Sequence, residues 1–144
     1  MRISAKTEYA CIAMLELASR YGSAGPVRIR EIAERHSVPP RFLVQILLQL
    51  KGEGLVASVR GAAGGYRLLS PPDEISLGRV MEVIDGLLDE EAPKSAASPD
   101  SPALKVLMQA WKEVSAMQFK MLDGITLADL LERAKEQGEQ MYHI

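Results

Sequence analysis

Apolar residues recur at helical spacing in six segments of the chain, and a glycine-rich stretch separates the third segment from the fourth. Ser4 can act as the N-cap of the first helix by accepting a backbone hydrogen bond. Behind it, apolar residues recur at i, i+3, i+4, i+7, i+8 and i+11, which predicts one buried face: Ala10, Ala13, Met14, Leu17, Ala18 and Tyr21. We expect this helix to end at Gly22.

The next two predicted helices are joined by a tight turn. A short helix over residues 30–36 directs Ile29, Ile32 and Ala33 inward, and Ser37-Val38-Pro39 ends it. A third helix begins at Pro40, because proline suits the first helical turn, and it stops at Gly52 and Gly54. Its inward residues are Leu43, Ile46, Leu47 and Leu50. Two helices joined this way are typical of a helix-turn-helix, whose second helix enters the major groove of DNA.

A β-hairpin follows the third helix. Val56, Val59 and Tyr66 fit two strands that flank residues 60–65, a glycine-rich tip that carries Arg60. Residues 54–72 contain no Asp or Glu. Taken alone, the stretch also fits a flexible surface hairpin. Behind a helix-turn-helix, however, it is typical of the wing of a winged helix-turn-helix.

The C-terminal part contains the longest predicted helix. Ser76 can cap a fourth helix that ends at Gly86, with Leu77, Val80, Met81 and Ile84 inward. Residues 87–102 are rich in proline, serine and acidic residues and indicate a linker. A helix over residues 103–122 then begins after Ser101 and Pro102, and a last helix over residues 127–137 begins at Thr126 with Asp129. The pattern divides the chain into residues 1–86, 87–102 and 103–144.

The long helix has an apolar surface wider than a small domain can cover. We therefore expect the matching helix of a second copy to cover it, and one larger monomeric core is the alternative. The expected dimerisation residues are Leu104, Leu107, Met108, Trp111, Val114, Ser115 and Leu122. The predicted fold is mainly α-helical with a small β-wing, a winged helix-turn-helix domain plus a long C-terminal dimerisation helix.

Charge divides the chain into unlike parts. The net charge is −2, but residues 1–80 carry 11 Lys and Arg against 7 Asp and Glu, while residues 81–144 carry 6 against 12. The N-terminal part therefore suits a polyanion such as DNA, although chance segregation in a short chain is the alternative.

The outward residues of the third helix include candidate base readers. Arg41, Gln45 and Gln49 are spaced by four residues and so lie on one face. Arginine can bind guanine through two hydrogen bonds and glutamine can do the same with adenine, whereas an ordinary solvated polar face is the alternative. Arg60 with Gly61 is the expected minor-groove contact. The expected DNA-binding set is Arg2, Ser4, Lys6, Pro40, Arg41, Gln45, Gln49, Arg60, Gly61, Gly64 and Tyr66.

Several of these segments match a known family. They are residues 4–10 (SAKTEYA), 29–33 (IREIA), Phe42 with Leu43 and Gln45, 54–66 (GLVASVRGAAGGY), 75–78 (ISLG), Trp111 and 125–130 (ITLADL). In these residues the sequence resembles the Rrf2 family of bacterial winged-helix transcription regulators, most specifically in the wing. The resemblance implies a homodimeric DNA-binding regulator.

Two features depart from this resemblance. Sensing members carry three cysteines before the dimerisation helix that hold an iron-sulfur cluster, and residues 87–102 contain none. Val44 stands where several relatives have a base-reading glutamate, so the operator sequence does not transfer. We expect no cofactor, and we interpret Asp89, Glu90 and Glu91 as part of the acidic linker rather than as a site for a hard cation.

The sequence favours no metal site and no disulfide. Cys11 is the only cysteine, and we interpret it as a small packed thiol. His36 and His143 share no metal-ligand spacing with it, and we expect both to be ordinary surface residues.

The remaining function classes are limited by what the sequence lacks. It has no apolar run that could span a bilayer and no signal segment, which predicts a cytoplasmic protein without a membrane partner. The glycine-rich loop lacks the lysine and hydroxyl residue of a P-loop, and no catalytic triad stands out, so we expect no enzyme.

We conclude from the sequence that the chain is a DNA-binding repressor that binds a pseudo-palindrome as a homodimer. A winged-helix module for protein–protein contacts is the alternative. Three regulatory routes stay open: an unknown small-molecule effector between the wing domain and the dimer helix, a response through Cys11, or no signal.

Overall fold

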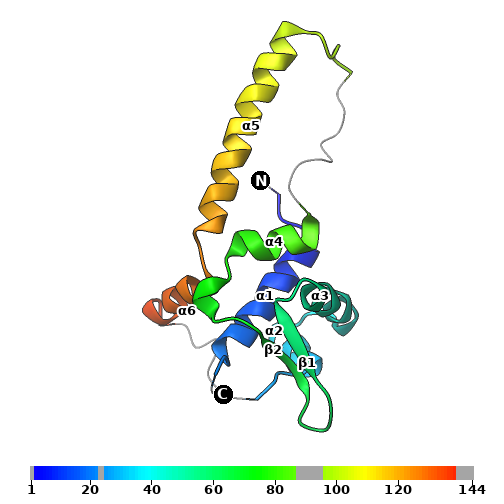
Figure 1. The fold of residues 1–144 in the computed structure, drawn as a ribbon, viewed down its shortest axis with the longest axis vertical. Helices are drawn as coiled ribbons and strands as arrows, with labels where there is room; N and C mark the ends of the chain where they lie inside the picture. Colours follow the sequence, from blue (N-terminus) through cyan, green and yellow to red (C-terminus); the bar gives the residue numbers. More distant parts are fainter. Residues whose placement is uncertain (1, 23–24, 87–95, 139–144) are drawn as a thin grey trace.

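The computed structural model describes residues 2–22, 25–86 and 96–138. Within them the chain forms six α-helices, one short 3-10 helix and a two-stranded sheet. The elements, labelled in Figure 1, are α1 (Ala5–Ser19), α2 (Ile29–His36), α3 (Pro40–Gly52), β1 (Val56–Val59), β2 (Gly65–Leu68), η1 (Pro72–Glu74), α4 (Leu77–Asp85), α5 (Pro102–Asp123) and α6 (Leu127–Glu136). The predicted fold class, mainly α-helical with a small β-wing, is confirmed.

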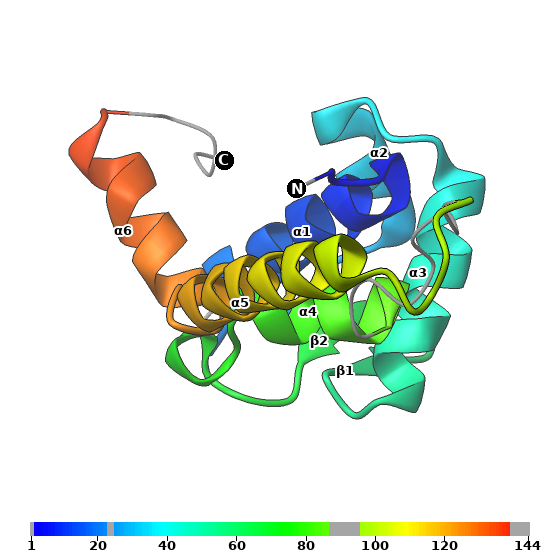
Figure 2. The ribbon, with the colours of Figure 1, turned by 90° about the horizontal axis from the view of Figure 1, so that it is seen from above.

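Helix α1 is the centre of the fold, because α2, α3, α4, α6 and β2 all contact it. Figure 2 shows it lying between α4 and α2. Ser4 caps it as predicted, since its side chain accepts a hydrogen bond from the backbone N–H of Thr7 at 3.1 Å. The predicted face is buried except for Tyr21, which is 42% exposed. That part of the prediction is wrong because the helix ends at Ser19, two residues before Tyr21.

The helix-turn-helix consists of α2, a short turn and α3. Ser37 adopts the left-handed conformation, with φ of 55°, and so turns the chain after α2. Pro40 occupies the first turn of α3, as predicted. All four predicted inward residues of α3 are completely buried, so the periodicity identified the packed face of this helix correctly.

The wing is an antiparallel hairpin whose strand β2 is joined to the segment before α2. In the hairpin Val56 pairs with Leu68 and Val59 pairs with Gly65. Tyr66 and Val27 exchange two backbone hydrogen bonds, of 2.8 and 2.9 Å. Strand β2 is thus fixed to the segment before α2, while the loop between the strands projects away from the body (Figure 1).

The C-terminal helices differ in how they meet the rest of the chain. Helix α5 has 22 residues, about 33 Å of helix, none of them buried, and it extends away from the body (Figure 1). Helix α6 begins with the predicted capping box of Thr126 and Asp129 and contacts α1 and η1. Leu127 is fully buried in the main core, and its backbone N–H donates to the carbonyl oxygen of Ile75 at 2.9 Å.

Candidate nucleic-acid interface

The exposed face of α3 lies opposite its buried leucines and isoleucine. Successive residues are about 100° apart around a helix, so Val44, Leu48, Arg41 and Gln45 share an arc of roughly 100°. All four are exposed. Gln49 lies at the edge of this arc and is half-buried. Its side-chain oxygen is shielded from water and, among the described residues, has no hydrogen-bond partner.

Arg41 leans to one side of this face. Its guanidinium carbon lies 5.1 Å from the centre of the Phe42 ring, in a cation–π contact. The Phe42 ring in turn lies 5.7 Å from the ring of Tyr9 on α1. The contact draws the guanidinium of Arg41 toward Phe42, and the rest of the exposed α3 face is left to Val44, Gln45 and Leu48.

The wing tip has a backbone that requires glycine. A Cβ atom at Gly64 would lie 2.2 Å from the carbonyl oxygen of Val59, and one at Gly65 would lie 2.5 Å from that of Val27. Gly61 has φ of 103°, which disfavours any side chain. Arg60 is exposed at this tight turn. The fixed loop therefore presents one cation beyond the end of β1.

The expected DNA-binding residues at the start of α1 differ in their exposure and in their hydrogen bonds. Arg2 is exposed and Lys6 is half-buried. Ser4 is exposed, but its hydroxyl caps α1 and also lies 3.5 Å from a carboxylate oxygen of Asp85. Thr7 donates a short hydrogen bond to the same carboxylate. Ser4 thus has a structural role in the start of the helix, and Arg2 and Lys6 supply the positive charge.

Sequence reasoning missed three exposed cations. Arg28 and Arg30 lie at the start of α2, and Arg67 lies on β2. In the described ranges none of them forms an ion pair with another residue. The alternation of Tyr66, Arg67 and Leu68 along the strand was a signal for an outward Arg67, because neighbouring strand residues face opposite sides.

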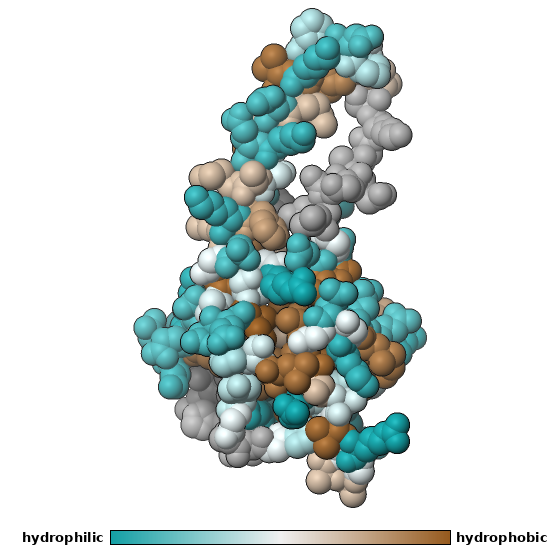
Figure 3. Space-filling model, viewed as in Figure 1, coloured by the Kyte–Doolittle hydropathy of each residue, from teal (hydrophilic) through white to brown (hydrophobic). Residues whose placement is uncertain are grey.

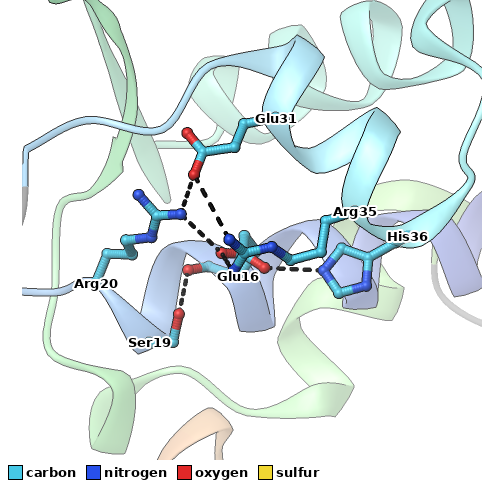
Figure 4. A network of polar contacts seen from close by, with 6 residues as sticks. All are labelled: Glu16, Ser19, Arg20, Glu31, Arg35 and His36. Atoms are coloured by element: carbon cyan, nitrogen blue, oxygen red, sulfur yellow. Dashed lines mark hydrogen bonds and ion pairs between the residues drawn. The ribbon is translucent and has the colours of Figure 1, made fainter. Parts of the chain in front are cut away.

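A buried carboxylate joins α1 to α2 (Figure 4). Glu16 is 0% exposed, and its oxygens lie 3.2 Å from Arg35, 3.4 Å from Arg20 and 2.8 Å from Nε2 of His36. Glu31 also pairs with Arg20. The prediction of an ordinary surface histidine is wrong for His36, because this partner lies twenty residues earlier on another helix. The second histidine, His143, lies outside the described residues.

Cys11 is a poor nucleophile in this fold. Burial, followed by the negative charges of Asp85 and Glu8, raises the pKa of its thiol from 9.0 to about 11. The thiolate is the reactive form of cysteine, so it is scarce at neutral pH. This environment agrees with the interpretation of a packed thiol.

Figure 3 shows one face of α5, and seven large apolar side chains of this helix are exposed in the single chain: Val106, Leu107, Met108, Trp111, Val114, Met117 and Met121. Of the expected dimerisation residues, Leu107, Met108, Trp111 and Val114 are exposed, and Leu104, Ser115 and Leu122 are half-buried. Trp111, the largest of these side chains, is 56% exposed. Lys105, Lys112 and Lys120 lie on the remaining polar side.

No helix of the described residues is long and apolar enough to cross a membrane.

A helix-turn-helix followed by a glycine-shaped, arginine-tipped hairpin defines a winged helix-turn-helix regulator. The comparisons with known proteins agree: a family model described as "Rrf2: Iron-dependent Transcriptional regulator" matches residues 3–133. The chain belongs to the Rrf2 family. It is therefore a DNA-binding transcriptional regulator and not an enzyme.

Relatives match along nearly the whole chain. The transcriptional regulator IscR of Aliivibrio salmonicida is 35% identical over 131 residues, which cover 91% of this chain and 77% of that protein. CymR of Bacillus subtilis is 34% identical over 145 residues and is covered completely, as is this chain. The solved structure of CymR, the global cysteine regulator of B. subtilis, has a TM-score of 0.76 at 34% identity and covers 92% of this chain and 98% of its own.

The family description reads "Iron-dependent", but the donor set of this chain does not fit an iron centre held by several thiolates. The 144-residue sequence contains one cysteine, and burial disfavours its thiolate. Within the described residues, no group of three His, Cys, Asp or Glu side chains could hold a metal ion. The acidic residues 89–91 and the rest of 87–95 lie outside the described residues.

Proposed function

We propose that two copies of this chain bind a pseudo-palindromic operator and repress transcription by occupying the promoter. Each copy would insert α3 into a major groove and direct Arg60 into the adjacent minor groove. The observation that carries the proposal is that an acid-free α3 face stands beside a wing whose backbone fixes an exposed arginine.

The surrounding charges support this arrangement. Arg28, Arg30 and Arg67 add exposed cations to Arg41 and Arg60. Such cations bind phosphates and release counterions, so the affinity falls steeply as salt rises. The cation–π contact with Phe42 favours a phosphate contact or a base contact at the edge of the site for Arg41, and the burial of Gln49 makes Gln45 the better candidate to read adenine.

The exposed apolar surface of α5 supports the homodimer. An apolar face of this width is costly in water, and a second copy of the same helix offers a matching surface under twofold symmetry. Residues 103–144 would then combine dimerisation with the α6 contacts to the body. We further propose that the dimer acts in the cytoplasm and without an iron-sulfur cluster, as its donor set suggests.

The test of DNA binding is Arg60→Ala. We expect operator affinity to fall by about 1–3 kcal/mol, because the variant loses its minor-groove cation while the wing turn, shaped by glycines, stays intact. Fluorescence anisotropy on a duplex from the gene's own promoter, repeated at several salt concentrations, measures the change. Arg133→Ala on α6 is the matched control, since it removes an exposed arginine away from the wing.

Equal affinities of the Arg60→Ala and Arg133→Ala variants at matched salt would contradict the wing assignment. Absence of any steep, salt-dependent DNA binding by the wild-type chain would contradict the function itself. That second result would favour the alternative, a winged-helix module for protein–protein contacts.

A further inference from the structure

Two exposed apolar side chains lie next to each other on one side of the exposed α3 face. Val44 is 44% exposed and Leu48 is 54% exposed. They are four residues apart, so their Cβ atoms lie about 6 Å from each other on the same side of the helix. Single exposed apolar residues are common on proteins, but this pair lies on the surface that the proposed function directs at base edges.

The chemistry of the major groove offers one apolar partner. The 5-methyl group of thymine is the apolar group that a natural base pair presents there, whereas cytosine presents an amino group that needs an acceptor. A carboxylate is the usual acceptor for that amino group, and α3 contains neither Asp nor Glu. Gln45, at the other edge of the exposed arc, can bind adenine through its amide.

We propose that Val44 and Leu48 recognise thymine 5-methyl groups, so that each operator half-site contains thymines at the positions under the middle of α3. The proposal rests on the proposed function, because it identifies the DNA sequence that the same surface reads. Base pairs are about 3.4 Å apart along the duplex. The two side chains therefore reach methyl groups one or two base pairs apart.

Charge complementarity favours DNA over a protein as the occupant of this apolar pair. Arg41 is on the same face, and Arg60 lies at the wing tip. No acidic residue of α3 opposes a phosphate backbone. An apolar pair surrounded by cations fits the major groove, where a thymine methyl group lies between the two phosphate backbones.

The test replaces thymine by deoxyuridine, which has the same hydrogen-bonding edge and lacks the methyl group. The full chain first selects duplexes from a random-sequence library, and each thymine of the selected half-site is then replaced in turn. We expect affinity, measured by anisotropy at one salt concentration, to fall about fourfold for each contacted methyl group, the value of one buried methylene.

The variants Val44→Ala and Leu48→Ala connect the effect to its side chains. Each should bind the thymine and deoxyuridine duplexes equally at the position that its side chain contacts, as in a double-mutant cycle. Alanine favours the helix and both residues are exposed, so folding is retained. Leu69→Ala, which truncates a leucine 46% exposed after β2, should keep the full difference.

Three outcomes overturn the proposal: selected sites without thymine, no position sensitive to deoxyuridine, or alanine variants that keep the wild-type difference. Unchanged DNA affinity of both variants would assign the apolar pair to another partner and overturn it too. A chain that retains no duplex even at low salt would instead disprove the proposed function. Equal retention of every duplex would contradict operator binding as well, whereas a selected sequence with no position sensitive to deoxyuridine would defeat this inference alone.

Discussion

At the scale of single residues, Glu16 of α1 connects that helix to α2, the first helix of the helix-turn-helix. It is fully buried, and Arg20, Arg35 and His36 surround its carboxylate. Removing one member of a buried ion pair costs more than the pair contributes, because the remaining charges lose their partner in a poorly solvated place. The network therefore fixes α2 against α1, and α2 carries the turn that positions α3.

We predict that Glu16→Gln lowers the free energy of unfolding by about 2–3 kcal/mol. This value lies below that of a fully buried pair, because Arg20 and Arg35 are partly exposed and Glu31 stays beside them. Urea unfolding followed by circular dichroism at a fixed protein concentration measures it.

The matched control is Glu34→Gln, an exposed glutamate of α2, which should change stability by less than about 0.5 kcal/mol. Equal stabilities of the two variants would mean that the carboxylate of Glu16 does not hold α1 and α2 together.

At the scale of elements, the wing is fixed by the space available at two glycines. At Gly64 a side chain would meet the backbone of Val59, Arg60 and Gly61, none of which can rotate away. Gly52, at the end of α3, has nothing within 4 Å of its expected Cβ position. The same substitution should therefore have opposite effects at the two positions.

We predict that Gly64→Ala distorts the wing turn, lowers the free energy of unfolding by about 1–3 kcal/mol, and reduces operator affinity at least as much as Arg60→Ala. Gly52→Ala should raise stability by about 0.4–1 kcal/mol, because alanine restricts the unfolded chain. Thermal unfolding and anisotropy on the same duplex measure both quantities. Wild-type DNA affinity of Gly64→Ala would show that the turn tolerates another shape.

The sequence predicted the helices and their caps better than it predicted the side-chain contacts between helices. The α3 stripe and the caps at Ser4, Ser76 and Ser101 depend on local spacing and local hydrogen bonds, and the structure confirms them. The contact of Glu16 with His36 depends on how α1 and α2 lie against each other, which spacing within one helix does not reveal. The half-buried position of Gln49 likewise follows from the packing around α3.

At the scale of the whole molecule, α5 carries the surface that the proposed dimer would use. Its apolar face is exposed along the helix, and the cluster that forms the main core contains no α5 residue. The main core of each copy is thus formed without any residue of α5 and does not need a second copy bound to that helix. Substitutions on the outer part of α5 should change assembly and leave the fold of each copy unchanged.

We predict that Val114→Glu dissociates the proposed dimer, because a carboxylate would be buried in an apolar contact. Sedimentation equilibrium should give a mass near the 15.8 kDa of one chain instead of twice that value. Gln109→Glu introduces the same charge on the polar side of α5 and should keep the dimer. Circular dichroism should be unchanged in both variants, and a dimeric Val114→Glu protein would assign the interface elsewhere.

The contact between Leu127 and Ile75 has a consequence for fragments and for mutational screens. A polypeptide that stops before α5 would lose Leu127, leave a gap in the core beside η1, and bind DNA poorly for lack of stability. Loss of function after a substitution at Leu127 would therefore indicate a destabilised DNA-binding domain, although this residue is about sixty positions from the wing. Genetic maps of such a regulator should count α6 with the DNA-binding part.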